Sequence, residues 1–247
     1  MGVEAIGVVG LGDLGGQIVR QNVWCGVDVV GYDKKCSGTP VNGDGLSGID
    51  PHLRGAVGDN LGSLSMSSSV TKVIELTDMT HWAVPSTELD SVPDISESDK
   101  TIVLHDSVMS NSKHATRDRR DAGNFVIAHC LMNEERKVIL AEGFGPVGRV
   151  NDHMSSLGLD VVRMSIEEHD RMMAESQGEY ARLIIERLTD LRALYSKGLL
   201  TPSSKELLAA LEHREGKWTL ATLESILSNP YVEVDKEALV KYRSIKD

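Results

Sequence analysis

The sequence predicts an α/β fold, a doubly wound parallel sheet of the Rossmann type, followed by an all-helical C-terminal half. Apolar runs of β type alternate with helical segments as far as residue 164. A glycine-rich turn at residues 10–16 joins the first β run to a helical segment. Beyond residue 164, apolar residues recur at helical spacing. We therefore expect two domains, a dinucleotide-binding domain over residues 1–164 and a helical domain over residues 165–247.

The first elements make one βαβ unit. An apolar β run covers residues 5–9, the glycine turn precedes a helix over residues 17–24, and a second β run covers residues 27–32. A strand, a glycine turn, a helix and a second strand in this order are typical of a parallel sheet. The segment 34–69 is rich in Gly, Ser, Asn and Asp, so we expect it to be mostly loop.

The later elements follow from the same periodicities. In the first domain we expect helices over residues 70–76, 110–120 and 150–157, and strands over residues 79–84, 101–104, 125–128, 138–143 and 159–164. Ser165 and Glu168 have the spacing of a capping box, which favours a helix start. In the second domain we expect helices over residues 174–194, 203–211, 218–227 and 236–246.

Composition limits the partners of this chain. It has 37 acidic residues against 26 basic ones and a formal net charge of -11, so it repels phosphate backbones and anionic lipid surfaces on average. No apolar stretch is long enough to span a bilayer. Cys25, Cys36 and Cys130 have neither disulfide nor zinc-site spacing. We therefore expect a cytoplasmic protein with a small-molecule substrate and no nucleic-acid, membrane or metal partner.

The glycine turn predicts a dinucleotide site, since glycines let the backbone approach a pyrophosphate and the following helix N-terminus offers free N–H groups. Asp33 ends the second strand, where a carboxylate binds the adenosine ribose, which favours NAD. Lys34 and Lys35 would instead suit the 2′-phosphate of NADP. The alternative is a tight turn without a ligand. The predicted cofactor contacts are Gly10, Leu11, Gly12, Asp13, Leu14, Gly15, Asp33, Ala83, Val84 and Pro85.

His129 is the candidate proton carrier. It follows the β run 125–128 directly, and an imidazole at a strand end exchanges a proton near neutral pH. A purely structural histidine is one alternative. A zinc site with Cys130 and Glu134 is another, which their position on an expected loop disfavours.

Near the start of the helical half stand Glu168, His169, Asp170, Met173, Ala174 and Gln177. This pattern resembles the E-H-D-x-x-M-A-x-x-Q segment of the prephenate and arogenate dehydrogenase family of tyrosine biosynthesis. The order of features agrees over nearly the whole chain, from the glycine turn through Asp33, the Ala-Val-Pro at residues 83–85, Ser107 and His129 to the helices.

The resemblance implies oxidative decarboxylation of prephenate to 4-hydroxyphenylpyruvate, with hydride transfer to NAD. It also implies that His129 accepts the proton of the substrate hydroxyl and that Ser107 contacts this hydroxyl and orients His129. The helical domain would form a homodimer. Prephenate carries two carboxylates, so its pocket needs cationic donors, and Arg214 or Lys217 would supply one.

Several positions depart from the family pattern. Met109 stands where the family has a lysine, Ala181 where it has a substrate-contacting histidine, and residues 130–134 replace its Pro- and Gly-containing loop. Two alternatives therefore stay open: a related dehydrogenase with a different substrate, and a catalytically impaired NAD-binding regulatory protein.

Overall fold

The computed structural model describes residues 5–34, 61–84, 88, 91–93, 99–119, 122–131, 136–143, 145–212, 226 and 228–232. The chain divides into two compact units, Met1–Ile166 and Glu167–Asp247, called unit 1 and unit 2 below. The functional roles that the sequence assigns to residues 1–164 and 165–247 stay predictions.

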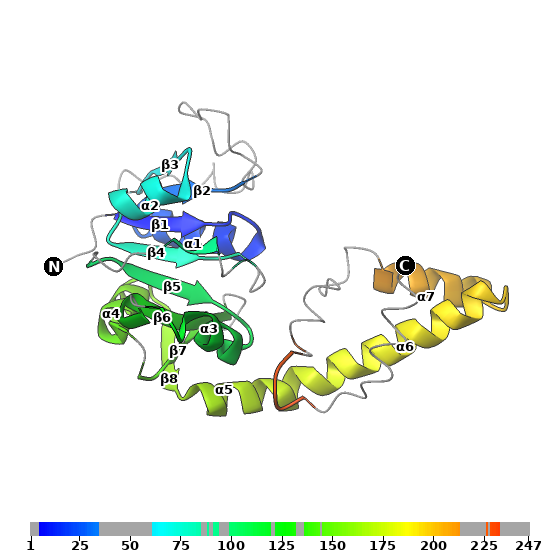
Figure 1. The fold of residues 1–247 in the computed structure, drawn as a ribbon. Coiled ribbons are helices and arrows are strands. Elements are labelled where there is room, and N and C mark those ends of the chain that lie inside the picture. The colour runs from blue at the N-terminus through cyan, green and yellow to red at the C-terminus, as the bar shows by residue number, and fades with distance from the viewer. Residues whose placement is uncertain are drawn as a thin grey trace. The chain divides into compact units, whose positions relative to one another are not determined.

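The described part of unit 1 contains an eight-stranded sheet in the order β3-β2-β1-β4-β5-β6-β7-β8 (Figure 1). Its strands are β1 Ala5–Val9, β2 Asp28–Tyr32, β3 Leu64–Met66, β4 Met79–Trp82, β5 Thr101–His105, β6 Phe125–Leu131, β7 Lys137–Ala141 and β8 Asp160–Met164. The pairs are parallel except that of β6 with β7, which is antiparallel. The predicted α/β class is confirmed.

Helices cover both faces of this sheet. They are α1 Asp13–Trp24, α2 Val70–Leu76, α3 Met109–Thr116 and α4 Val147–Ser156, with a 3-10 turn η4 Ala122–Asn124. Ile18 of α1 and Met154 of α4 share a buried cluster with Val103 of β5. Val73 of α2 packs instead in a cluster with Ile102. Neighbouring residues of β5 therefore bury against opposite helix layers, as in a doubly wound sheet.

Several predicted boundaries in unit 1 differ from those of the structure. The first helix begins at Asp13 rather than at residue 17, and the Gly16 amide already donates to the Gly12 carbonyl across 2.7 Å. β3 lies inside the segment expected to be loop; it is a three-residue strand that pairs with β2. β6 continues to Leu131, so His129 lies within a strand rather than after it, because pairing with β7 extends the ladder.

The described helices of unit 2 are α5 Ile166–Met173, which begins at the last residue of unit 1, a π-helical turn η5 Ala174–Gly178, α6 Glu179–Ser196 and α7 Pro202–Glu212. The helix predicted over residues 174–194 therefore begins with a π turn. Residues 228–232 form a turn. Gly198 has a φ of +69°, and the Leu199 amide donates to the Leu194 carbonyl, which ends α6 in the manner of a glycine C-cap. Except for Ile226, the helices predicted over residues 218–227 and 236–246 lie outside the described residues.

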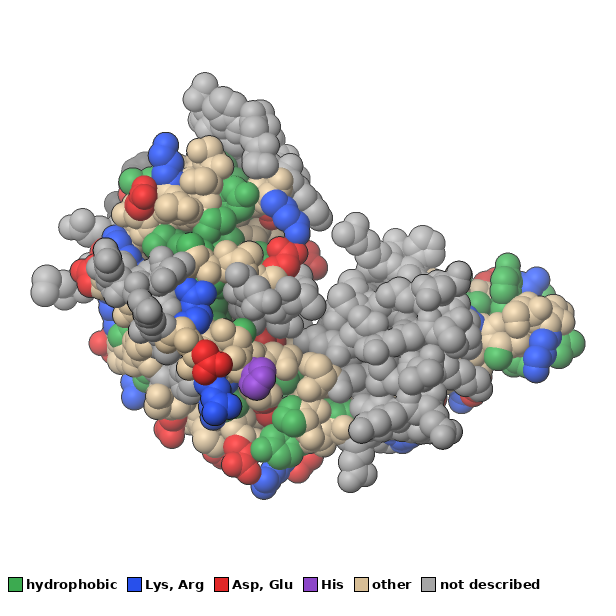
Figure 2. All heavy atoms as spheres, viewed as in Figure 1, with side chains coloured by type: hydrophobic (Ala, Val, Ile, Leu, Met, Phe, Trp, Pro, Cys, Tyr) green, Lys and Arg blue, Asp and Glu red, His purple; other side chains and the backbone are tan. Residues whose placement is uncertain are grey.

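On the face of unit 1 that Figure 2 shows, basic and acidic side chains are interspersed over the described surface. A single-sign patch of the kind that binds nucleic acid is not visible among the coloured residues of that view. None of the helices in the described ranges has both the length and the apolar character needed to cross a membrane.

Candidate functional site

The three glycines of the predicted cofactor turn have different structural roles. Gly10 has a φ of +86°, and a Cβ atom there would lie 2.7 Å from the Ala83 carbonyl oxygen. A Cβ atom on Gly15 would overlap the Gly10 carbonyl oxygen, whereas one on Gly12 would meet no described atom within 4 Å. The packing of the turn itself requires Gly10 and Gly15, but at Gly12 the backbone borders open space that a ligand can occupy.

α1 begins directly behind this turn. Gly12 is its N-cap residue and supplies no side chain to the first amides of the helix. Asp13 is exposed in the first turn, while Leu11 and Leu14 pack against the buried cluster beneath. Amides at a helix N-terminus attract anions, so the turn and α1 fit the pyrophosphate of a dinucleotide.

Asp33 lies just past β2, beside the glycine turn. Its Oδ2 atom accepts a hydrogen bond from the Leu11 amide at 2.8 Å. The Gly10 amide donates to the Tyr32 carbonyl at 2.9 Å, which also ties the end of β2 to the turn. The Asp33 carboxylate therefore has the position from which an acidic residue reaches the ribose hydroxyls of a dinucleotide.

Lys34, the first of the two lysines that would suit NADP, is engaged by a carboxylate. Its Nζ atom donates to Oε1 of Glu88 across 2.6 Å. The hydrogen bond and the negative charge of Glu88 raise the pKa of the Lys34 ammonium above its ordinary value. Lys35 lies outside the described residues.

The end of β4 borders the same turn. The Ala83 amide donates to the Val9 carbonyl at 2.8 Å and continues the pairing of β4 with β1. The Ala83 carbonyl and the Val84 side chain are the atoms nearest to a Cβ atom built on Gly10. Ala83 and Val84 thus lie against the turn, and their contact with a cofactor stays a prediction. Pro85 lies outside the described residues.

Ser107 lies two residues after β5 and His129 lies in β6, and these two neighbouring strands are parallel. His105 of β5 is in register with Ala128 of β6, and the Asp106 amide donates to the Ala128 carbonyl at 3.0 Å. Both candidate catalytic residues follow this pair, at the carboxyl edge where ligands of open α/β sheets bind. Their catalytic roles stay predictions.

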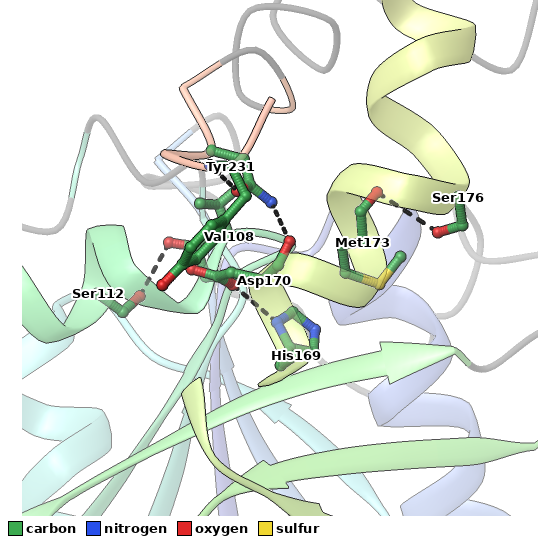
Figure 3. Close-up of polar contacts among 9 residues, drawn as sticks. Val108, Ser112, His169, Asp170, Met173, Ser176 and Tyr231 are labelled. Carbon is green, nitrogen blue, oxygen red and sulfur yellow. Dashed lines mark hydrogen bonds and ion pairs between the residues drawn. The ribbon is translucent and has the colours of Figure 1, made fainter. Parts of the chain in front are cut away.

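The connection from β5 to α3 is fixed by Asp106. Its carboxylate accepts hydrogen bonds from the Val108 amide and from the Ser112 hydroxyl, each at 3.0 Å (Figure 3). This carboxylate ties the residue before α3 to a side chain within α3 and so holds the backbone around Ser107 in place.

A row of buried polar side chains lies behind this edge, and sequence reasoning missed it. His81 of β4, His105 of β5 and Cys130 of β6 lie on one face of the sheet. His81 is in register with the residue two before His105, and His105 is in register with the residue two before Cys130. His81 Nδ1 and His105 Nε2 are 2.8 Å apart, and His105 Nδ1 lies 3.3 Å from Cys130 Sγ. The weak signal in the sequence is one histidine inside an apolar β run, His81, and another directly after the next run, His105.

The row is uncharged at neutral pH. Burial, with a smaller effect from the charge of His129, lowers the pKa of His105 to about 3. Burial also lowers the pKa of His81 well below its ordinary value and raises the pKa of the Cys130 thiol to about 12. His153 of α4 lies with its ring 6.1 Å from that of His81, and burial lowers its pKa to about 4.

Within the ranges that the structure describes, no group of three or more His, Cys, Asp and Glu side chains is arranged to hold a metal ion. His129 and Cys130 are consecutive residues of β6, so their side chains leave opposite faces of the sheet. Glu134, the third residue of the weighed zinc site, lies outside the described residues.

In unit 2, the E-H-D segment lies in α5. His169 Nδ1 and Asp170 Oδ1 are 2.8 Å apart and both side chains are fully buried. Asn229 Nδ2 donates to the Asp170 carbonyl at 2.7 Å (Figure 3), and the Arg171 guanidinium lies 5.3 Å above the Tyr231 ring. These contacts anchor the turn around residue 229 to α5. The predicted substrate residues Arg214 and Lys217 lie outside the described residues.

No family model and no curated protein match this sequence. Solved structures do share its fold. A prephenate dehydrogenase from A. aeolicus, in complex with hydroxyphenyl propionate and NAD+, is 17% identical with a TM-score of 0.52 over 99% of this chain and 82% of its own. The arogenate dehydrogenase of Synechocystis is 13% identical, with a TM-score of 0.58 over 97% of this chain and 87% of its own.

(S)-3-hydroxybutyryl-CoA dehydrogenase from Ralstonia eutropha also has this fold, with 15% identity and a TM-score of 0.55 over 98% of this chain and 90% of its own. At such identities the likeness is one of fold. The dehydrogenases that the sequence motifs resemble are among the proteins that share it.

Proposed function

We propose that this chain is an NAD-dependent oxidoreductase whose cofactor lies along the carboxyl edge of the unit 1 sheet. The observation that carries the proposal is the contrast between Gly12 and its neighbours: a side chain has open space at Gly12 and none at Gly10 or Gly15. A turn that served packing alone would not need a glycine at Gly12, where φ is -67°. A backbone surface kept bare in front of a helix N-terminus suits a pyrophosphate.

The residues around the turn would then each contact a different part of the cofactor. The amides at the start of α1 would hold the pyrophosphate, and Asp33 would accept hydrogen bonds from the adenosine ribose hydroxyls. Ala83 and Val84 would border the nicotinamide, which supplies the hydride acceptor when the cofactor is bound. Since Glu88 engages Lys34, we propose NAD rather than NADP as the cofactor.

For the substrate we propose prephenate or arogenate. His129 would take the proton of the ring hydroxyl while hydride leaves the carbon that bears it, and loss of the ring carboxylate would complete aromatisation. Ser107 would contact the same hydroxyl and orient the His129 ring. Arg214 or Lys217 would pair with a substrate carboxylate, because a carboxylate buried without a cation is strongly unfavourable.

One observation favours a second candidate, a dehydrogenase with another substrate or a cofactor-binding protein with impaired catalysis. Met109 stands in place of the family's lysine, and its side chain is fully buried in a cluster with Ile127 and Ile139. This side chain therefore serves the core and offers no charge to an anionic substrate.

We further propose that the chain acts in the cytoplasm as a homodimer joined through unit 2. Large apolar side chains of unit 2, such as Leu183 and Leu194, are exposed in the single chain. Exposed apolar side chains that share one face of a helix are candidates for an interface between copies.

The test has two stages. Calorimetric titration of the purified protein with NAD is expected to give a 1:1 complex per chain, and absence of binding would reject the proposal. The protein is then mixed with NAD and, separately, prephenate, arogenate or (S)-3-hydroxybutyryl-CoA, and absorbance of reduced nicotinamide is followed. Turnover with the first two supports the proposed substrates, turnover with the third supports the other dehydrogenase, and NAD binding without turnover of any supports the impaired protein.

A further inference from the structure

Lys34 and Glu88 come from opposite sides of the glycine turn. Lys34 follows β2 and Glu88 follows β4, and β1, which leads into the turn, lies between these two strands in the sheet. Their hydrogen-bonded ion pair, with 2.6 Å between Nζ and Oε1, therefore bridges the carboxyl end of β1. The backbone at Glu88 is held in turn, because the Ser91 hydroxyl donates to its carbonyl oxygen at 2.5 Å.

The charges near this ion pair determine how well the site binds the additional phosphate of NADP. NADP differs from NAD by a 2′-phosphate on the ribose that Asp33 would contact, and such a phosphate needs a cation beside it. Lys34 is next to Asp33 in the chain, but Glu88 already occupies its ammonium. Among the described residues there, Asp33, Lys34 and Glu88 together carry a formal charge of -1, which disfavours the additional phosphate.

We propose that Glu88 is a specificity-determining residue that directs the site to NAD by engaging Lys34 and adding a negative charge. The inference rests on the proposed dinucleotide site and goes beyond it, because it names the residue that chooses between the two cofactors. Lys34 would act as a 2′-phosphate ligand once Glu88 is neutralised. The mechanism involves binding alone and no chemical step.

The exposure of the Lys34 and Glu88 side chains determines how large the effect on NADP affinity should be. The Lys34 side chain is 64% exposed and that of Glu88 is 35% exposed, so water and salt screen their interaction. We expect neutralisation of Glu88 to tighten NADP binding by about 1.5- to fivefold at low salt, the range of an exposed charge pair. The gain should shrink as salt concentration rises.

The experiment measures the dissociation constants of NAD and NADP by calorimetry for the unmodified chain, Glu88→Gln, Lys34→Gln and the double variant. Glu88→Gln is expected to raise the affinity for NADP relative to NAD, and the double variant is expected to lose this gain. Glu186→Gln is the matched control. It removes a carboxylate of similar exposure, 39%, from the Arg182–Glu186 ion pair of unit 2 and should leave the NADP to NAD ratio unchanged.

A second measurement needs no cofactor. NMR titration of methyl-labelled lysines is expected to give a lower pKa for Lys34 in Glu88→Gln, because the pair raises that pKa. An unchanged pKa would overturn the inference. So would an unchanged cofactor ratio in Glu88→Gln, or a gain that persists in the double variant. If the unmodified chain bound neither dinucleotide, both the proposed function and this inference would fail. If the chain bound NAD but Glu88→Gln left the NADP to NAD ratio unchanged, only the role of Glu88 would be overturned.

Discussion

The carbonyl oxygen of Gly10 occupies the space in which a side chain on Gly15 would begin. The end of β1 and the first turn of α1 are therefore packed backbone against backbone, a close approach that only glycine permits. Gly12 lies between them in the chain and has no such restriction. Substitutions at these positions should separate folding from ligand binding.

Gly12→Val is expected to keep the fold and to weaken NAD binding by at least about a hundredfold, because its side chain would fill the space where the pyrophosphate meets the backbone. Gly15→Ala is the contrasting variant. Its Cβ atom must displace the Gly10 carbonyl, so it should lower the urea midpoint of unfolding. Calorimetry and urea titration measure the two effects. Unchanged NAD affinity in a folded Gly12→Val variant would remove the pyrophosphate from this turn.

Asp33→Ala is expected to weaken NAD more than NADP, because only NAD offers both ribose hydroxyls to the carboxylate. Asp33→Asn is the matched control for the turn, since an amide oxygen can still accept the hydrogen bond from the Leu11 amide. Both dissociation constants are measured by calorimetry. A larger loss for NADP than for NAD would contradict the proposed ribose contact.

His129→Asn is expected to lower kcat by about a hundredfold or more with little change in NAD affinity, because asparagine keeps a hydrogen-bonding group but cannot take a proton near neutral pH. The measurement is steady-state turnover of whichever proposed substrate is active. His114→Asn, in α3, is a control that should keep full activity. Equal rates for His129→Asn and the unmodified chain would exclude His129 as the base.

Local patterns predicted those elements whose cause is local. The sequence predicts a strand over residues 5–9 and a helix over residues 70–76, and the structure has β1 and α2 at these positions. α2 follows a turn in which Ser69 accepts the Lys72 amide hydrogen, so its start is determined within four residues. The glycine turn and Asp33 could likewise be placed from sequence, because one βαβ unit positions them all.

Features that depend on distant pairing could not be predicted in this way. β3 is only three residues long, and it is held where Asp28 accepts hydrogen bonds from the amide and hydroxyl of Ser63. The continuation of β6 past His129 depends on the antiparallel strand β7. The row of His81, His105 and Cys130 requires the register of three strands, which no local pattern contains.

This row, together with His153 beside it, should make the protein sensitive to acid. The folded-state pKa values of His105, about 3, and His153, about 4, lie below the ordinary value of 6.5, so the unfolded chain takes up protons first as pH falls. The neutral rings contribute stability that is fully present above pH 6.5 and is lost as pH falls toward 3. Each additional proton bound by the unfolded state lowers the free energy of unfolding by about 1.4 kcal/mol per pH unit.

Urea unfolding between pH 7.5 and 4.5 measures this dependence. His105→Gln is expected to flatten the slope of unfolding free energy against pH, whatever its stability at pH 7.5, because it removes one proton-binding group from the unfolded chain. His114→Asn, which replaces a histidine outside the buried row, should leave the slope closer to that of the unmodified chain. An equal slope for His105→Gln and the unmodified protein would mean that His105 titrates normally in the folded state.

The surface of α6 leads to the final prediction. Leu183 and Leu194 are 50% and 41% exposed, and eleven residues of α-helix bring them to nearly the same face. Tyr195 and Leu199 extend the exposed apolar surface at the end of the helix. If two copies bury this surface, light scattering at micromolar concentration gives the mass of a dimer, and Leu183→Glu with Leu194→Glu shifts it toward a monomer. Leu76→Glu changes a similarly exposed leucine of unit 1, at 61%, and should leave the mass unchanged. A monomer mass for the unmodified chain, or a dimer unaffected by the double change, would place no interface on this face of α6.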